Sequence, residues 1–310
     1  SINLKGRDYI MKKRKIILLC LIAILTVVYV LQLAFSGKTQ VKDFYLEDNP
    51  DAIIITNSNK DTTTLVKDGD NWFINDKKFP ADINSVNGIL SDIKNIRSLG
   101  VVSHDSKDSR YGFDSASAIE VTLKKEGKEL RTVKIGKVSA TGQQSYILLD
   151  ASKDVLLASG NLTNNVSKSV EDLRDKNVYS INVSDILKVD VTNNKEKYQL
   201  AKTGEPAIWT LSSINNAATE VKVDTEKVNN WISNLTNLRV QSFADDNVSL
   251  PTEALANVSI TTNQGKDIVV SVYASTEEEK YLVKSSQIPY LFYVNSYTGE
   301  KYIKELKDLQ

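Results

Sequence analysis

The stretch VNGILSDIKNIR at residues 86–97 returns in altered form as VNNWISNLTNLR at residues 228–239. In both copies the apolar residues recur every three or four positions, which predicts an amphipathic helix that faces a sheet. Recurrence of this kind indicates an internal duplication. A residue shared by both copies more often serves the fold than a single active site. The duplication therefore sets the expected architecture before any other pattern is considered.

The similarity extends along both copies in the same order. The matching segments include Leu65-Val66-Lys67 with Leu200-Ala201-Lys202, Val121-Thr122-Leu123 with Val258-Ser259-Ile260, and Tyr146-Ile147-Leu148 with Tyr281-Leu282-Val283. The offset between copies changes only in polar segments, where surface loops tolerate insertions. We therefore expect two repeats, at residues 43–178 and 179–310, each of a size usual for one domain.

Within a repeat the periodicity indicates strands joined by tight turns, with helices laid on them. Ile119, Val121 and Leu123 alternate with polar residues, as in a half-buried strand. Asp82 and its counterpart Asp224 stand where a helix N-cap is expected. A second helix is expected from an apolar stripe at Leu162, Val166, Val170 and Leu173. Each repeat is thus predicted to be α+β, a mostly antiparallel sheet with two helices.

An uncharged run from Ile16 to Phe35 precedes the first repeat. About 20 apolar residues in a helix span roughly 30 Å, the thickness of the hydrocarbon core of a bilayer. The cations Lys12 to Lys15 favour a cytoplasmic N-terminus. A cleaved signal peptide is the alternative, although its apolar core is normally shorter. The predicted fold class is therefore an N-terminal transmembrane helix followed by two tandem homologous α+β repeats.

The position of the single methionine suggests where translation of the chain starts. Met11 is the only methionine, and Lys5-Gly6-Arg7 can be encoded by a purine-rich run that resembles a bacterial ribosome-binding site. We interpret residues 1–10 as untranslated upstream sequence and residues 11–36 as a cytoplasmic basic stub with a transmembrane anchor. The predicted location is the bacterial cell membrane, single-pass, with the bulk of the chain extracytoplasmic.

Charge and cysteine content narrow the expected partners. The chain has 39 basic and 39 acidic residues, and the basic ones are enriched before the apolar run, which leaves the remainder mildly acidic. An acidic surface argues against nucleic acid, because neutralising phosphates requires basic residues. The single cysteine, Cys20, lies inside the apolar run, so we expect no disulfide.

No catalytic or cofactor-binding motif stands out. His104 is the only histidine, and it lies in a polar loop that the second repeat lacks. A zinc site needs three or four His or Cys ligands, which the chain after the anchor does not supply. The spacing of Asp105, Asp108 and Asp114 does not match a calcium-binding EF-hand loop. We therefore predict no metal, no cofactor and no catalytic residue, while a carboxylate pair assembled by the fold stays open.

Several short motifs follow one another along the first repeat. After the apolar run come Trp72-Phe73-Ile74, Phe79-Pro80-Ala81-Asp82, Tyr111-Gly112-Phe113-Asp114, Ile135-Gly136-Lys137, Tyr146 and Asp172-Leu173-Arg174-Asp175-Lys176. In this order they resemble a bacterial family called domain of unknown function 4340. Members of that family are often encoded beside ABC-type permeases of the gliding-motility kind. The resemblance implies an accessory part of an export or envelope machine and assigns no catalytic residue.

The expected function is a non-enzymatic binding or scaffold module, anchored in the membrane and extracytoplasmic. The partners expected are the membrane, through Ile16 to Phe35, and an ABC-type permease or another envelope protein. A solute receptor with a ligand held between the repeats is one alternative, because clefts between domains are common ligand sites. A carboxylate-dependent envelope hydrolase is the other.

The candidate partner surface is built from features that the second repeat lacks. Its residues are Tyr111, Asp114, Arg174, Asp175 and Lys176. A structural role is the competing interpretation, since a buried aromatic beside a turn is common and Arg174 can belong to a local ion pair.

Overall fold

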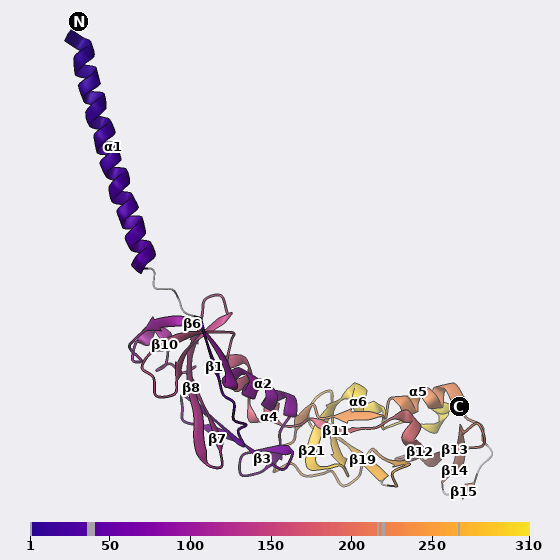
Figure 1. Ribbon diagram of the computed structural model, residues 1–310. Helices are drawn as coiled ribbons and strands as arrows, with labels where there is room; N and C mark the ends of the chain where they lie inside the picture. Colours follow the sequence, from indigo (N-terminus) through magenta and orange to yellow (C-terminus); the bar gives the residue numbers. More distant parts are fainter. Residues whose placement is uncertain (1, 36–40, 216, 219–220, 266) are drawn as a thin grey trace. The chain divides into compact units, whose positions relative to one another are not determined.

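The structure is a computed structural model that describes residues 2–35, 41–215, 217–218, 221–265 and 267–310. By its internal contacts the chain divides into two compact units. Unit 1 comprises residues 1–77 and 84–168, and unit 2 comprises residues 78–83 and 169–310. Figure 1 shows the elements of both units along the chain. The repeat boundaries inferred from the sequence remain a prediction.

The strands of unit 1 lie in one antiparallel sheet in the order β1-β6-β10-β9-β8-β7-β2-β3-β4. Their bounds are β1 Lys42–Tyr45, β2 Ala52–Asn57, β3 Thr62–Asp68, β4 Asn71–Ile74, β6 Asn95–Ser103, β7 Ile119–Lys125, β8 Lys128–Val138, β9 Gln144–Leu149 and β10 Val155–Ser159. Neighbouring strands are joined by tight turns. Glu126 and Gly127, for example, both have positive φ, as the type I′ turn of a two-residue hairpin requires.

Unit 2 contains a sheet in the order β15-β14-β13-β12-β18-β19-β20-β21-β17 and a separate pair, β11-β16. The bounds are β5 Phe79–Pro80, β11 Asn177–Ser180, β12 Ile186–Asn193, β13 Lys197–Thr203, β14 Ile208–Ile214, β15 Ala217–Ala218, β16 Asn237–Arg239, β17 Ser242–Phe243, β18 Ala256–Thr262, β19 Asp267–Ala274, β20 Lys280–Ser285 and β21 Ile288–Asn295.

The two units share one strand order. The series β17-β21-β20-β19-β18-β12-β13-β14 of unit 2 matches β6-β10-β9-β8-β7-β2-β3-β4 of unit 1, and β11-β16 matches β1-β6. The continuous strand β6 therefore corresponds to two short strands, β16 and β17, with Val240 and Gln241 between them. This break separates the β11-β16 pair from the main sheet of unit 2.

Each copy of the duplicated stretch forms a helix that leads into a strand. Helix α2 spans Ile83–Lys94 and precedes β6, whereas α5 spans Thr225–Ser233 and precedes β16. Asp224 caps α5, because its Oδ1 accepts hydrogen bonds from the backbone N–H groups of Glu226 (2.9 Å) and Lys227 (3.1 Å). A helix cap of this kind stabilises by about 1 kcal/mol.

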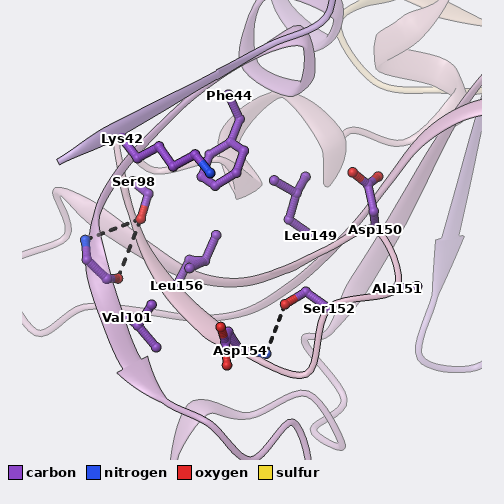
Figure 2. Close-up of a pocket in the computed structure, with 11 residues that line it drawn as sticks. Lys42, Phe44, Ser98, Val101, Leu149, Asp150, Ala151, Ser152, Asp154 and Leu156 are labelled. Carbon is purple, nitrogen blue, oxygen red and sulfur yellow. Dashed lines mark hydrogen bonds between the residues drawn. The ribbon is translucent and has the colours of Figure 1, made fainter. Parts of the chain in front are cut away.

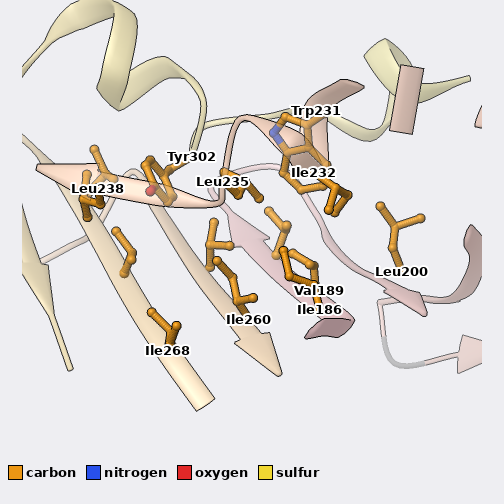
Figure 3. Packing of buried hydrophobic residues seen from close by; sticks show 14 of the residues in the cluster. Ile186, Val189, Leu200, Trp231, Ile232, Leu235, Leu238, Ile260, Ile268 and Tyr302 are labelled. Atoms are coloured by element: carbon orange, nitrogen blue, oxygen red, sulfur yellow. The ribbon is translucent and has the colours of Figure 1, made fainter. Parts of the chain in front are cut away.

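The apolar face of α5 lies on the sheet of unit 2, as Figure 3 shows. Trp231 and Ile232 from the helix, with Leu235 just after it, join a buried cluster that includes Val189 and Ile260 from the strands. Burying a side chain of this size stabilises by about 1.5–3 kcal/mol. The helical spacing of the duplicated stretch thus serves core packing in this unit.

The predicted fold class is wrong because it assigns too much of the chain to helices. The chain is mostly antiparallel sheet, and the expected second helix of the first repeat is two separate turns, α3 Thr163–Val166 and α4 Val170–Leu173. Ser169 begins the second turn, since its Oγ accepts from the N–H of Asp172 at 3.2 Å. In unit 2 the counterpart is the five-residue α6, Ser296–Glu300. Two short turns place apolar residues on one side as well as a continuous helix does, so spacing alone misled the prediction.

The predicted membrane anchor is also wrong. Helix α1 spans Ile2–Phe35, but no helix in the described part of the chain is long and apolar enough to cross a membrane. This finding overturns the predicted single-pass localisation together with the anchor at Ile16 to Phe35.

Candidate functional site

A cavity of about 510 Å³ lies in unit 1 beside β1 and β6. The turn between β9 and β10, which carries Asp150 and Asp154, also lines the cavity (Figure 2). The volume falls in the range of about 300–1,000 Å³ typical of ligand sites. We take this cavity, called here the β6 pocket, as the candidate site.

Among the residues that the structure describes, β1 pairs with only part of β6. The pairing of β1 with β6 ends at Lys42, which faces Ser98, while β6 continues to Ser103. At Gly100 the φ angle is 145°, and the pairing of β6 with β10 shifts register between Ser98 and Val101. This irregularity is held by the buried Ser98, whose Oγ accepts from the N–H of Gly100 at 3.2 Å. A glycine inside a strand often marks a bulge of this kind.

The floor of the pocket is apolar. Leu149 and Leu156 line it and are 5% and 6% exposed, whereas Val101 at its edge is 46% exposed. The ring of Phe44 forms part of the wall beside β1, as Figure 2 shows. An exposed valine next to a buried apolar floor leaves room for an apolar group from another molecule.

Charged groups stand around this floor. The Nζ atom of Lys42 lies over the Phe44 ring, 4.7 Å from its centroid, in a cation–π contact. Asp150 Oδ1 accepts from the N–H of Thr132 at 3.0 Å, which fixes the turn. Asp154 contributes a second carboxylate, so the pocket presents two acidic groups and one cation.

His104, the only histidine, contacts the same turn. Its Nδ1 lies 2.7 Å from Asp154 Oδ1, and its side chain is 84% exposed. Ser152 has an oxygen that accepts from the N–H of Asp154 at 3.1 Å. Within the described residues no group of three or more His, Cys, Asp or Glu is placed to hold a metal ion. The chemistry that this arrangement supports directly is recognition of an apolar group with a positive charge beside it.

A second cavity, of about 420 Å³, lies in unit 2 between α5 and α6. Trp231 forms part of its wall and donates from Nε1 to the carbonyl of Lys301 at 2.8 Å. Lys304 and Asp308 on its rim form an ion pair at 3.6 Å. The polar groups named here are already paired within the protein, so we rank this cavity below the β6 pocket.

The predicted residues Tyr111 and Asp114 lie in unit 1. The hydroxyl of Tyr111 donates to the carbonyl of Val102 at 3.0 Å, and its ring stacks at a tilt on Tyr146 with centroids 4.8 Å apart. Gly136 permits this loop, since a Cβ atom there would stand 2.2 Å from the carbonyl oxygen of Tyr111. Asp114 is exposed. Tyr111 thus holds its loop against β6 close to the candidate pocket.

The predicted residues Arg174, Asp175 and Lys176 lie in unit 2. The N–H of Asp175 donates to the carbonyl of Pro80 at 2.8 Å, which ties this segment to β5. Lys176 Nζ lies 3.7 Å from Asp172 Oδ1 on the preceding turn. The five residues of the predicted surface therefore divide between the two units, and the surface remains a prediction.

Arg174 is buried rather than displayed. It is 8% exposed, and its Cζ lies 3.3 Å from the centroid of the Phe243 ring and 3.9 Å from that of Phe79. Tyr290 contributes a third ring at 4.7 Å, and Glu171 Oε2 lies 4.0 Å from the guanidinium. Burial lowers the pKa of Arg174, against an opposing contribution from Glu171. We call these five residues the arginine clasp.

The sequence did not point to the groups of the β6 pocket. Lys42, Asp150 and Asp154 are ordinary surface residues in sequence terms, and their neighbourhood depends on the pairing of distant strands. One available signal was Gly100, because an isolated glycine in a strand pattern indicates a bulge or a close approach of backbone.

Comparison with known proteins gives one match. The family described as "Domain of unknown function (DUF4340)" matches residues 72–258. No curated protein and no solved structure matches the chain. The family resemblance drawn from the short motifs is thereby confirmed.

Proposed function

The chain belongs to the DUF4340 family, and from this premise we propose that it is a binding module that captures a partner protein at the β6 pocket. The proposed role is that of an accessory component without chemistry of its own. The partner class proposed is an ABC-type permease or another envelope protein. The observation that carries the proposal is the edge of β6 that continues past β1.

This edge offers backbone groups to another chain. On one side β6 pairs with β10 as far as Ser103, whereas on the other side its pairing with β1 ends at Ser98 among the residues that the structure describes. Val101 and Val102 beyond that point are 46% and 38% exposed. An extended segment that adds to a sheet edge gains main-chain hydrogen bonds, and adjacent pockets supply specificity.

The β6 pocket lies beside the same edge. Because side chains of a strand alternate between faces, a segment added along β6 would direct every second side chain towards one face. The buried floor at Leu149 and Leu156 can receive an apolar group from such a segment. Edge and pocket together favour a polypeptide as ligand.

A solute receptor is the second candidate, because the volume of about 510 Å³ also suits a small molecule. The hydrolase alternative would need carboxylates free to act as acid and base. Asp150 accepts from a backbone N–H and Asp154 contacts His104, so neither favours that alternative.

The test compares two valines of equal exposure in unit 1. Val101 and Val66 are both 46% exposed, but only Val101 lines the pocket. We expect Val101→Asp to abolish crosslinked partners in native cells while the melting temperature stays within about 2 °C of the wild type, since exposed substitutions change stability little. Val66→Asp should retain the crosslinks.

Three outcomes would contradict this proposal. Retention of partners by Val101→Asp would remove the pocket from the function. Equal loss in both variants would indicate a general surface effect. A small molecule that co-purifies with the wild type and is released by Val101→Asp, with no partner protein, would favour the solute receptor.

A further inference from the structure

The cavity of about 420 Å³ in unit 2, called here the α5 pocket, lies where the duplicated helix meets the segment that closes its copy. The closing segments of the two copies match, because the carbonyls of Leu173 and Leu309 both accept, at 2.8 Å, from the N–H group of the aspartate that precedes the duplicated helix. Counting back from these leucines pairs Asn165 with Lys301 and Lys168 with Lys304. The walls of the pocket can therefore be compared with the same place in unit 1.

In unit 1 this place is filled by polar side chains that bond to one another. Asn165 Nδ2 donates to Asp92 Oδ2 at 2.8 Å, and Lys168 Nζ donates to Ser85 Oγ at 3.1 Å. Gly88 leaves room for this contact, since a Cβ atom there would stand 3.1 Å from the carboxamide of Asn165. Helix α2 and the closing segment are thus tied directly to each other.

In unit 2 the matching positions line a cavity. The side chain that joins α5 to the closing segment is Trp231, in the place of Ile89, and its Nε1 donates to the carbonyl of Lys301 at 2.8 Å. The counterparts of the five polar and glycine positions of unit 1 all line the α5 pocket: Lys227, Asn230, Asn234, Lys301 and Lys304. One copy therefore has a closed contact where the other has an open polar site.

Carboxamides stand on the helix wall of the pocket. Lys227, Asn230 and Asn234 are spaced three and four residues apart, so they share one side of α5 and its C-terminal end. All three are exposed, and Asn234 Nδ2 donates to the carbonyl of Asn230 at 2.9 Å, which holds its side chain at the helix end. A carboxamide carries a donor and an acceptor side by side, which suits neighbouring hydroxyl groups. This wall therefore fits a ligand with several hydroxyls.

An aromatic ring from α6 also lines the pocket. Tyr297 is 69% exposed, and Lys301 Nζ lies over its ring, 4.5 Å from the centroid. A pyranose ring has an apolar face of C–H groups and a polar edge of hydroxyls, so it can stack on an exposed aromatic ring while its hydroxyls bond to amides. Because Lys301 lies over the same ring, an acidic group that pairs with this lysine brings the rest of the ligand beside Tyr297.

The charges on the lining favour an acidic ligand, because three lysines stand against two carboxylates. Lys304 is already paired with Asp308 at 3.6 Å, and Lys227 Nζ donates to the carbonyl of Gln310. Lys301 contacts an aromatic ring instead, so it is the lysine best placed to pair with an anion.

We propose that the α5 pocket binds a saccharide that carries an acidic group, a carboxylate or a phosphate. The sugar ring stacks on Tyr297, its hydroxyls bond to Asn230 and Asn234, and the acidic group pairs with Lys301. This site shares no residue with the β6 pocket, and it does not depend on the function proposed there.

The test titrates the full chain with four probes: tetragalacturonate, glucose 6-phosphate, neutral maltotetraose and inorganic phosphate. Ligand-observed NMR gives the affinities. We expect the acidic saccharides to bind about fivefold more tightly than maltotetraose, because of the ion pair with Lys301. Failure of both acidic saccharides to bind would overturn the proposal. Equal binding of maltotetraose would remove the acidic group from it, and equal binding of inorganic phosphate would indicate an anion site without sugar recognition.

Two single variants assign the contacts. Tyr297→Ala should weaken binding of the acidic saccharides about tenfold, since it removes the stacking surface. Tyr45→Ala, a change at a tyrosine of unit 1 that is 66% exposed, should leave the affinity unchanged. Lys301→Ala should remove the advantage of acidic over neutral saccharides. Undiminished binding by Tyr297→Ala, or an advantage that survives Lys301→Ala, would contradict the assigned contacts.

A third variant closes the pocket. Asn230→Gly, Asn234→Asp and Lys301→Asn together give unit 2 the residues that unit 1 has at these positions. We expect this triple variant to unfold cooperatively and to bind none of the saccharides, because the new asparagine can bond to the new aspartate across the pocket. Retained binding would overturn the proposal. If the triple variant does not fold, Tyr297→Ala still decides, because an exposed side chain contributes little to stability.

Discussion

In unit 1 the carbonyl of Ile93, near the end of α2, accepts a hydrogen bond from Arg131 Nη1 at 3.1 Å. In unit 2 the matching carbonyl of Leu235, just after α5, accepts one from the hydroxyl of Tyr179 at 3.0 Å. The last carbonyls of a helix have no partner within the helix, so a buried helix end needs a donor from elsewhere. The two units meet the same need with different side chains.

The strand registers show that two positions have exchanged roles. Arg131 faces Leu123, and its counterpart Ile268 faces Ile260. Similarly, Phe44 faces Ile96 on β6, and Tyr179 faces Leu238 on β16. Where unit 1 has a phenylalanine and an arginine, unit 2 has a tyrosine and an isoleucine.

This comparison shows how the repeats diverged without losing the fold. Arg131 Nη1 also donates to the carbonyls of Lys94 (2.8 Å) and Phe44 (3.3 Å), so one cation serves three acceptors. In unit 2 the tyrosine hydroxyl is joined by that of Tyr302 at 2.6 Å. A buried donor at either position satisfies the helix end, but loss of both would leave a carbonyl unpaired.

The largest expected effect comes from Arg131→Ala. It leaves one buried and two partly buried carbonyls without this donor and opens a cavity, so we expect the free energy of unfolding of unit 1 to fall by about 3 kcal/mol or more. Urea unfolding followed by the fluorescence of Trp72, the tryptophan of unit 1, measures the change. Hydrogen exchange in unit 2 is the internal control and should not change. A loss below about 1 kcal/mol would show that water or another group replaces the arginine.

Tyr179→Phe tests the same helix end in unit 2. It leaves the carbonyl of Leu235 and the hydroxyl of Tyr302 without their partner, and we expect a loss of about 1–3 kcal/mol. Hydrogen exchange across residues 228–239 should rise, with residues 86–97 unchanged. If both stretches respond, the effect is not local to unit 2 and the comparison between units is broken.

The exchange of roles can be tested by giving unit 1 the two residue types that unit 2 has at the matching positions. Arg131→Ile alone should destabilise unit 1, and adding Phe44→Tyr should recover about 1 kcal/mol, because the new hydroxyl can reach the helix end. A double-mutant cycle on urea midpoints gives this coupling. Additive losses would mean that the matching positions are not interchangeable.

The smallest expected effects are changes in folding stability at acidic pH. Lys195 and Lys307 lower the pKa of Glu305 in unit 2 to about 2, so its stabilising contribution is present above pH 4.5 and is lost as the pH falls towards 2. Burial raises the pKa of Asp92 in unit 1, although a hydrogen bond from Asn165 opposes the shift. Protonation of Asp92 therefore favours the folded state as the pH falls towards 3.8.

These opposite signs are checked by urea midpoints at pH 5 and pH 3. Glu305→Gln should lose less stability than the wild type over this interval, and Asp92→Asn should lose more. Comparison of each variant with the wild type separates the contribution of that carboxyl group from the general effect of acid on stability. Reversal of either sign would contradict the assigned environment of that group.

Much of the strand pattern could be predicted from the sequence, but the candidate site could not. The alternation at Ile119, Val121 and Leu123 is seen as buried, inward-facing positions of β7. By contrast, the stripe from Leu162 to Leu173 was predicted as one helix and is two turns. Periodicity reports which side of a segment is apolar, and it does not report where a backbone is interrupted.

The sequence by itself determined the duplication, the strands that alternate and the family to which the chain belongs. Only the tertiary structure decided that, among the described residues, β6 continues past β1 and that the turn with Asp150 and Asp154 lines the same pocket as Phe44. It also decided that Arg174 is enclosed by aromatic rings rather than displayed. The reason is physical: local patterns reflect interactions between near neighbours, whereas the β6 pocket and the arginine clasp are made by strands and turns that are distant in sequence.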